Sequence, residues 1–134
     1  GSLELARRVD VLIASERFAA ALAGPAEDPE TALDALRRIG PDRVVVTLGG
    51  KGSLGSDCGR VIRQFAFPVE AVDTTGAGDV YHGAFLFGLL REWGMEDCMR
   101  FASAASALKC QTMGAQRGIP HLEQVQAFME SRRT

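Results

Sequence analysis

The sequence of 134 residues contains no asparagine and only two lysines, and it lacks any apolar run of the roughly 18 residues that a membrane-spanning helix needs. Its longest apolar segment, residues 80–90, is interrupted by His82 and by glycines. The formal net charge of −2 gives no excess of positive charge for binding nucleic acid or a membrane surface. We therefore expect neither as a partner. The remaining composition, 46% hydrophobic and 24% charged, is typical of one globular domain.

Cysteine is also scarce. Cys58, Cys98 and Cys110 are odd in number and have no metal-ligand spacing. Together with the lack of a recognisable signal peptide, this predicts reduced thiols in a cytoplasmic protein. Cys98 and Cys110 stand in apolar helical sequence, so we expect them to pack in the core.

The first part of the chain predicts a layered α/β arrangement. The short apolar runs at residues 9–14 and 43–48 are typical of strands buried on both faces of a parallel sheet. Between them, residues 16–23 and 29–39 predict two helices, and residues 3–8 predict the end of an earlier helix. Strand, helix, helix and strand in this order indicate an α/β fold.

The second part begins with glycine-rich and extended segments and continues with helices. The predicted elements are a glycine-rich turn that opens a short strand at residues 49–56, a hairpin turn at 57–60, a return strand at 61–67, an extended approach at 65–72, and helices at 80–93, 96–113 and 121–132. The first two of these helices are apolar nearly all round, which is typical of helices between layers. Two parallel strands and one hairpin are too little sheet to cover them. We therefore predict that residues 1–134 form the C-terminal half of a larger domain.

Residues 73–79, Asp-Thr-Thr-Gly-Ala-Gly-Asp, form a small-residue turn at the start of a helix. Gly76 and Gly78 permit backbone conformations closed to bulkier residues and leave room for another molecule. The first N–H groups of a helix have no partner inside it and lie at the positive end of its dipole, which suits phosphate. The carboxylate of Asp79 would repel a phosphate. Its presence is explained if it acts as an ionised base that takes the proton from a hydroxyl attacking the phosphate.

A plainer interpretation of this turn is that Asp79 only complements the helix dipole. The wider pattern favours the first interpretation. Residues 73–85, Asp-Thr-Thr-Gly-Ala-Gly-Asp-Val-Tyr-His-Gly-Ala-Phe, closely resemble the C-terminal signature of the ribokinase-like (PfkB) carbohydrate kinases. The resemblance implies that Asp79 is the catalytic base and that the amides of Gly76, Ala77 and Gly78 form an anion hole.

A second motif, Thr-x-Gly-x-x-Gly, follows the strand predicted at residues 43–48. Ligands of open α/β sheets bind at the carboxyl ends of strands, and glycines there let amides approach phosphates. The spacing is not that of a Walker P-loop. A glycine-rich hairpin turn is the alternative interpretation. The resemblance to the family implies that Thr47, Gly49 and Gly52 contact ATP.

The segment after the first predicted strand departs from the family pattern. Related kinases often carry Asn-x-x-Glu there, which organises magnesium and phosphate through water; this chain has Ser15 and Phe18 instead. Glu16 is a partial substitute that would reach Mg²⁺ through water. Ser15 is either a nucleotide contact or simply the cap of the following helix.

Other positions match parts of the family's sites less closely. Asp73 and Thr75 match a monovalent-cation site of some members, so potassium is an expected activator if that site is retained. Gly114 belongs to a loop that resembles the other wall of that site and a nearby adenine pocket. His82 follows Asp79 by one turn, where it would either face a ligand or pack, and His121 is expected to begin the last helix.

The resemblance implies the C-terminal portion of a ribokinase-like three-layer α/β/α domain with a mostly parallel central sheet. It also implies an ATP- and Mg²⁺-dependent kinase of a sugar, polyol, nucleoside or 2-keto-3-deoxy acid. Two alternatives stay open: a vitamin-precursor kinase of the same fold, and a kinase-derived regulatory module that binds nucleotide or sugar. The half-domain alone is expected to be inactive. Relatives often dimerise through a lid, so a homodimer of the full-length protein is conceivable from the resemblance alone.

Overall fold

The computed structural model describes residues 4, 6, 8–111 and 120–132. The chain divides into two compact units, which we call unit 1 (Gly1–Gln64) and unit 2 (Phe65–Thr134). Unit 1 holds the sheet, and unit 2 is helical. Among the described residues, no helix combines the length and the apolar character that crossing a membrane requires.

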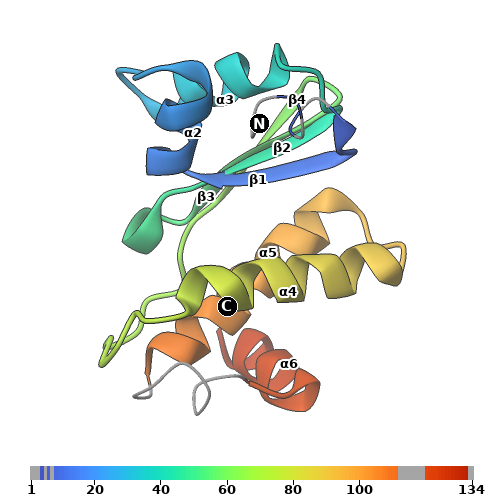
Figure 1. Cartoon of the computed structure of the whole chain (residues 1–134). Helices are drawn as coiled ribbons and strands as arrows, with labels where there is room; N and C mark the ends of the chain where they lie inside the picture. Colours follow the sequence, from blue (N-terminus) through green and yellow to red (C-terminus); the bar gives the residue numbers. More distant parts are fainter. Residues whose placement is uncertain (1–3, 5, 7, 112–119, 133–134) are drawn as a thin grey trace. The chain divides into compact units, whose positions relative to one another are not determined.

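Unit 1 is a four-stranded sheet in the order β1-β2-β3-β4 with helices α2 and α3 (Figure 1). Its elements are β1 (Val11–Ser15), α2 (Glu16–Ala23), α3 (Pro29–Arg37), β2 (Arg43–Thr47), the 3₁₀ turn η1 (Gly49–Lys51), β3 (Ser53–Asp57) and β4 (Arg60–Gln64). The described residues Glu4, Ala6 and Arg8 are also helical, in agreement with the helix end predicted at residues 3–8. The parallel pairing of β1 with β2 confirms that part of the prediction, and β2-β3 and β3-β4 are antiparallel. A mostly parallel sheet therefore stays a prediction for the complete domain.

Helices α2 and α3 begin at side-chain caps. The Ser15 hydroxyl oxygen accepts the Phe18 N–H at 3.1 Å, and the Asp28 carboxylate accepts the Thr31 N–H at 2.7 Å. Hydrogen bonding by the Thr31 side chain, followed by this backbone bond, lowers the pKa of Asp28. Both helices direct apolar side chains into one core on the sheet, whose buried members are Ala6, Leu12, Ala14, Ala19, Leu33, Leu36, Val44, Val46, Leu48 and Leu54.

Unit 2 consists of α4 (Ala77–Leu90), α5 (Met95–Cys110) and α6 (Leu122–Ser131). Helices α4 and α5 lie side by side, and α6 packs on α5 (Figure 1). The core between them contains Phe101, Ala104, Ala105, Ala107, Val125 and Phe128. Phe101 packs on Phe87 and on Trp93, with ring centroids 5.5 and 5.2 Å apart. Apolar side chains lie on more than one face of α4, since Phe85 is fully buried while Leu86 and Leu90 are exposed; its placement between layers stays a prediction.

Two predicted segments were wrong in extent. The return strand ends at Gln64, and residues 65–72 form no strand. After Gln64 the chain packs into unit 2, where the rings of Phe67 and Phe128 lie 5.4 Å apart. The amide of Val72 donates to the carbonyl of Cys110 at 2.7 Å, so it takes a helix end as its acceptor in place of a neighbouring strand.

The helix boundaries also differ from the prediction. Helix α4 begins three residues earlier than expected, because Gly76 already reverses the chain with φ of 79°. It ends at Leu90, since Glu92 adopts φ of 61° and the Trp93 amide turns back to the Gly88 carbonyl at 3.0 Å. Helix α5 ends at Cys110 with Gln111 as its cap. Helix α6 begins after His121, as expected.

Candidate active site

The glycine turn of unit 2 leads directly into α4. Gly76 is the N-cap in the left-handed conformation, which a residue without Cβ adopts at little cost. Asp79 stands in the first helical turn and is exposed. Gly78 is helical, so the prediction that both glycines shape the turn holds for Gly76 alone. A Cβ placed on Gly78 would meet no described atom within 4 Å, which leaves open space beside its backbone.

Hydrogen bonds within the turn distinguish its amides. The Thr75 N–H donates to the Asp73 carboxylate at 2.9 Å, and the Ala77 N–H donates to the Thr74 carbonyl at 3.1 Å. Within the described residues, the amides of Gly76 and Gly78 donate to no acceptor of the chain. Like the amides of Thr74 and Asp79, which also have no acceptor there, they remain available to an anion.

The last turn of α5 holds the glycine turn. The carbonyl oxygen of Cys110 accepts the amides of Val72 and Asp73 at 2.7 and 3.1 Å. The hydroxyl of Ser106 donates to the carbonyl of Ala77 at 3.2 Å. Sequence reasoning missed both contacts. The only sequence signal is a hydroxyl residue within an alanine-rich helix.

The Cys110 side chain is half-buried beside this turn. Burial raises the pKa of its thiol; the charge of Lys109 opposes this shift and the charge of Asp73 adds to it. Cys98 is buried and Cys58 is exposed, and none of the three forms a disulfide within the described residues. The prediction of core packing is thus confirmed for Cys98 and holds in part for Cys110.

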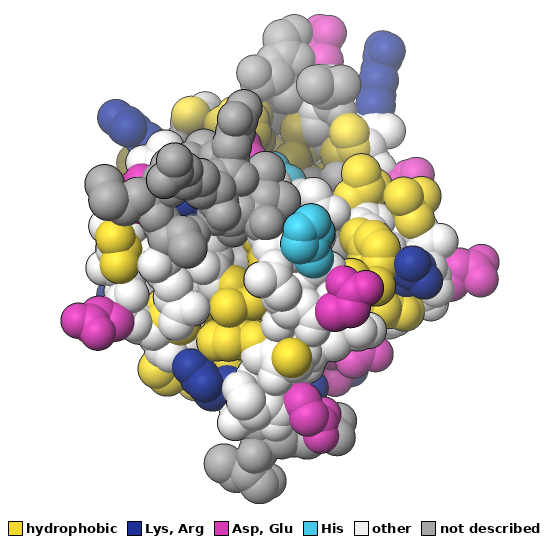
Figure 2. All heavy atoms as spheres, turned by 90° about the horizontal axis from the view of Figure 1, so that it is seen from below, with side chains coloured by type: hydrophobic (Ala, Val, Ile, Leu, Met, Phe, Trp, Pro, Cys, Tyr) yellow, Lys and Arg dark blue, Asp and Glu magenta, His cyan; other side chains and the backbone are white. Residues whose placement is uncertain are grey.

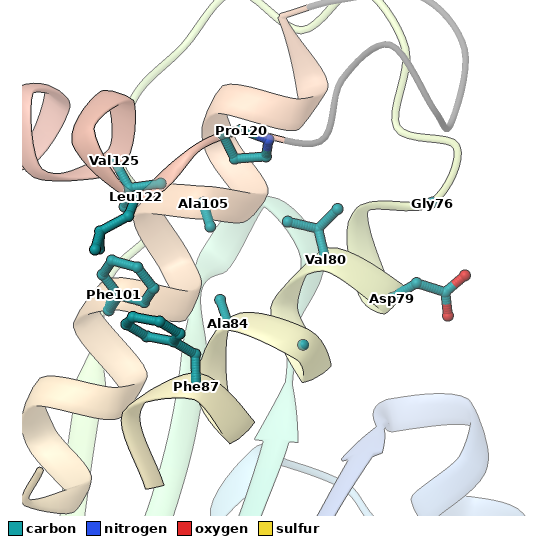
Figure 3. A pocket seen from close by; sticks show the side chains of 11 residues that line it. Gly76, Asp79, Val80, Ala84, Phe87, Phe101, Ala105, Pro120, Leu122 and Val125 are labelled. Carbon is teal, nitrogen blue, oxygen red and sulfur yellow. The ribbon is translucent and has the colours of Figure 1, made fainter. Parts of the chain in front are cut away.

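A cavity of about 430 Å³ opens behind the turn, between α4, α5 and the start of α6. Its lining is almost entirely apolar, and Gly76 and Asp79 stand at its rim (Figure 3). The Asp79 carboxylate points away from Phe87 and Phe101, which lie deep in the cavity (Figure 3). Asp79 is therefore directed to solvent, not into the apolar interior.

In unit 1, the parallel register brings two predicted site residues together. Ser15 and Thr47 are direct partners at the carboxyl ends of β1 and β2. This is the edge where ligands of α/β sheets bind. Thr47 is half-buried, whereas Ser15 and Glu16 are exposed. Since the Ser15 hydroxyl oxygen accepts a backbone N–H, the capping interpretation of this residue is confirmed.

The predicted glycine-rich turn after β2 is a 3₁₀ turn closed by its own backbone. The Leu48 amide donates to the Gly52 carbonyl at 2.8 Å. Gly49 and Gly52 have φ of 59° and 99°, so both use conformations that favour glycine. A Cβ placed on Gly49 or Gly50 would meet no described atom within 4 Å. The backbone is therefore open to a close ligand.

Other predicted residues have simpler surroundings. His82 is exposed on α4, and the His121 amide donates to the Gln124 side chain at 2.8 Å at the start of α6. Gly114 lies outside the described residues. Within the described ranges, no group of three or more His, Cys, Asp and Glu side chains is arranged to hold a metal ion. Figure 2 shows hydrophobic side chains reaching one face of the molecule among charged ones.

Comparison with known proteins gives a consistent result. The model of the pfkB family of carbohydrate kinases matches residues 1–122. A ribokinase of Haemophilus influenzae is 35% identical over 133 residues, which cover 95% of this chain and 43% of that protein. A ribokinase of Lactococcus lactis is 39% identical over 102 residues, or 76% of this chain and 34% of that protein. The chain thus spans less than half the length of these relatives.

Solved structures agree with the α/β fold expected from the sequence. Thermotoga maritima ribokinase matches with a TM-score of 0.89 and 35% identity, over 96% of this chain and 44% of that one. Arabidopsis thaliana ribokinase complexed with ribose and ATP matches with a TM-score of 0.88 and 34% identity, over 96% and 43%. This fold, the glycine turn that precedes Asp79 and the family match over nine-tenths of the chain lead to one assignment: the chain belongs to the pfkB family of carbohydrate kinases.

Proposed function

We propose that the protein containing this chain transfers the γ-phosphoryl group of ATP to a hydroxyl group of a sugar or sugar-like acceptor. One observation carries the proposal: an exposed carboxylate, Asp79, stands in the same helical turn as the unengaged amides of Gly76 and Gly78. Open amides alone are common at helix starts, so the match of the carbohydrate kinase family over residues 1–122 is what favours a base over a dipole-complementing acid. The combination of base and anion-binding donors suits phosphoryl transfer.

In the proposed mechanism, Asp79 accepts the proton of the acceptor hydroxyl. The acceptor oxygen then forms a bond to the γ-phosphorus while the bond to the β-phosphate oxygen breaks, and ADP leaves. The anion hole proposed at Gly76–Gly78 stabilises the negative charge on the transferring group. Within it, Gly76 and Gly78 would donate directly, since the Ala77 amide is engaged by Thr74.

The nucleotide is proposed to contact the edge where β1 and β2 end. Thr47 at the end of β2, the open backbone of Gly49 and the half-buried Gly52 would face the phosphates. Ser15 lies beside Thr47 and retains a hydroxyl hydrogen to donate, although its oxygen accepts the helix cap. Gly114 remains a predicted nucleotide contact outside the described residues. A relative, the putative ribokinase II of E. coli, is known in complex with ATP and Mg²⁺.

Magnesium would supply positive charge to the phosphates. The described residues suit such an ion, because Mg²⁺ in kinases is bound chiefly by phosphates and water with one or two carboxylates. Glu16, exposed at the first turn of α2, is the proposed carboxylate and would act through water. For potassium, Asp73 is the proposed ligand with Thr75, whose amide already fixes the Asp73 carboxylate.

The structure of each unit supports the proposal that this chain is the C-terminal half of one domain. In unit 1, β1 is an apolar edge strand that pairs only with β2 among the described strands. In unit 2, Leu90 is 77% exposed on a helix whose other faces are apolar. An N-terminal half would pair with β1 and supply acceptor contacts, so the half alone is proposed to be inactive. A homodimer is proposed only for the full-length protein.

The acceptor is proposed only as a class, because the relatives include ribokinases, a nucleoside kinase and a 6-phosphofructokinase. The test is ADP release by the full-length protein with Mg-ATP and a panel of sugars, sugar acids and nucleosides. Release that depends on one acceptor and disappears in Asp79→Asn would support the proposal and name the acceptor. ATP binding without release for any acceptor would overturn it in favour of a regulatory binding module.

A further inference from the structure

Ser106 links α5 to the start of α4: its hydroxyl donates to the Ala77 carbonyl at 3.2 Å. The serine is half-buried and is flanked by Ala105 and Ala107, so packing alone does not require a hydroxyl there. Its bond is also partly shielded from water. A hydrogen bond in such surroundings is stronger than one in the open.

The carbonyl of Ala77 and the amide N–H of Gly78 belong to the same peptide group. That group is planar, so fixing the direction of the carbonyl also fixes the direction of the N–H on its opposite side. A donor on the carbonyl also polarises the group and makes its N–H a better donor. The Gly78 amide has no acceptor among the described residues, so it is available to an anion.

A second contact from the end of α5 supports this role. Cys110 is the last residue of α5, so its carbonyl has no acceptor role inside the helix. Its carbonyl holds the amides of Val72 and Asp73 at the entrance of the turn. One helical turn of α5 therefore holds the glycine turn at both ends.

We infer that Ser106 is a positioning residue, which aims the Gly78 amide at the transferring phosphoryl group through the shared peptide plane. The inference rests on the proposed kinase function. It predicts that loss of the hydroxyl weakens stabilisation of the transition state and leaves nucleotide binding unchanged. If the hydroxyl only stabilised α5, its loss would not lower transition-state stabilisation while leaving nucleotide binding unchanged.

The experiment uses the full-length protein and its Ser106→Ala, Ser106→Thr and Ser131→Ala variants. Ser131 is the matched control, because its hydroxyl donates to the Phe128 carbonyl at 2.7 Å on α6. For Ser106→Ala we expect kcat to fall roughly three- to tenfold, the range that one lost hydrogen bond gives, with KM for Mg-ATP unchanged. We expect Ser106→Thr to restore kcat and Ser131→Ala to match the wild type.

A transition-state mimic separates positioning from a general structural effect. The affinity of ADP with aluminium fluoride should fall in Ser106→Ala by the same factor as kcat, while the affinity of ADP alone stays constant. Equal kcat in Ser106→Ala and wild type would overturn the inference but not the kinase proposal. A parallel loss of ADP affinity and kcat would also overturn it. A wild type without turnover would instead refute the proposed function.

Discussion

Gly88 of α4 lies so close to Cys98 of α5 that a Cβ on the glycine would stand 2.7 Å from the cysteine Sγ. The same Cβ would lie 2.9 Å from the ring of Trp93. The two helices thus pack around a position without a side chain, next to the ring cluster of Phe87, Trp93 and Phe101. This close approach sets the distance between the helix that carries Asp79 and the helix that holds its turn.

Gly88→Ala is expected to destabilise the protein, because the added methyl group has no space between α4 and α5. Overpacking of this kind costs about 1–3 kcal/mol. Gly83→Ala is the control on the same helix: a Cβ there meets no described atom within 4 Å, so alanine should be neutral or stabilising. Urea unfolding of both variants measures the difference. Equal midpoints would contradict the packing argument.

Asp79→Asn should lower kcat by at least roughly 100-fold, the usual contribution of a general base. Binding of ATP should persist, since the amide side chain keeps the size of the carboxylate and the helix start is unchanged. Asp97→Asn is the control, because Asp97 is also an acid in the first turn of a helix in unit 2. Steady-state kinetics and calorimetric titration with ATP measure the two effects. A similar loss in both variants would point to helix-dipole effects instead of base catalysis.

The two glycines of the turn are expected to respond differently to alanine. Gly76→Ala places a side chain at φ of 79°, which costs about 1–2 kcal/mol. Gly78→Ala stands in helical backbone with open space, so its unfolding free energy should stay constant or rise. Its turnover should nevertheless fall, because the new methyl group would narrow the approach to the amide. Unfolding curves and kinetics of the pair test this; an equal loss of stability would refute the distinction.

Thiol labelling should proceed in the order Cys58 first and Cys98 last. Cys58 is exposed in the hairpin turn and Cys98 is buried. Cys110 should react slowly at neutral pH, because burial raises its pKa and less thiolate is present. Mass spectrometry after timed alkylation gives the order. Faster labelling of Cys110 than of Cys58 would contradict the structure.

The same raised pKa sets a pH dependence of stability. The folded state favours the protonated Cys110 thiol. The thiol's contribution to the free energy of unfolding is therefore complete below the ordinary pKa of 9.0 and is lost as the pH rises above it. Cys110→Val has no thiol, so its stability should fall less steeply at alkaline pH. Unfolding midpoints measured from pH 7 to higher values, relative to those of Cys58→Val, test the effect.

Much of the chain could be predicted from the sequence because its signals are local. Apolar runs gave the two parallel strands, the cap residues Ser15 and His121 marked helix starts, and the signature at residues 73–85 indicated the family. The glycine Gly76 was recognisable because only a residue without Cβ adopts its φ easily. These features depend on neighbours in the chain, and the printed sequence contains them.

Tertiary structure decided what depends on residues far apart in the chain. The extended run at residues 65–72 does not form a strand. The amides of Val72 and of the following Asp73 donate to the carbonyl of Cys110, which is more than thirty positions away in the chain. The Ala77 amide was engaged by the turn itself, whereas those of Gly76 and Gly78 stayed open. No periodicity or motif in the sequence indicates the contact of Ser106 with Ala77. Such contacts arise only when helices pack. The sequence therefore determined which residues are candidates for the site, and the packing of α5 determined how the glycine turn is held.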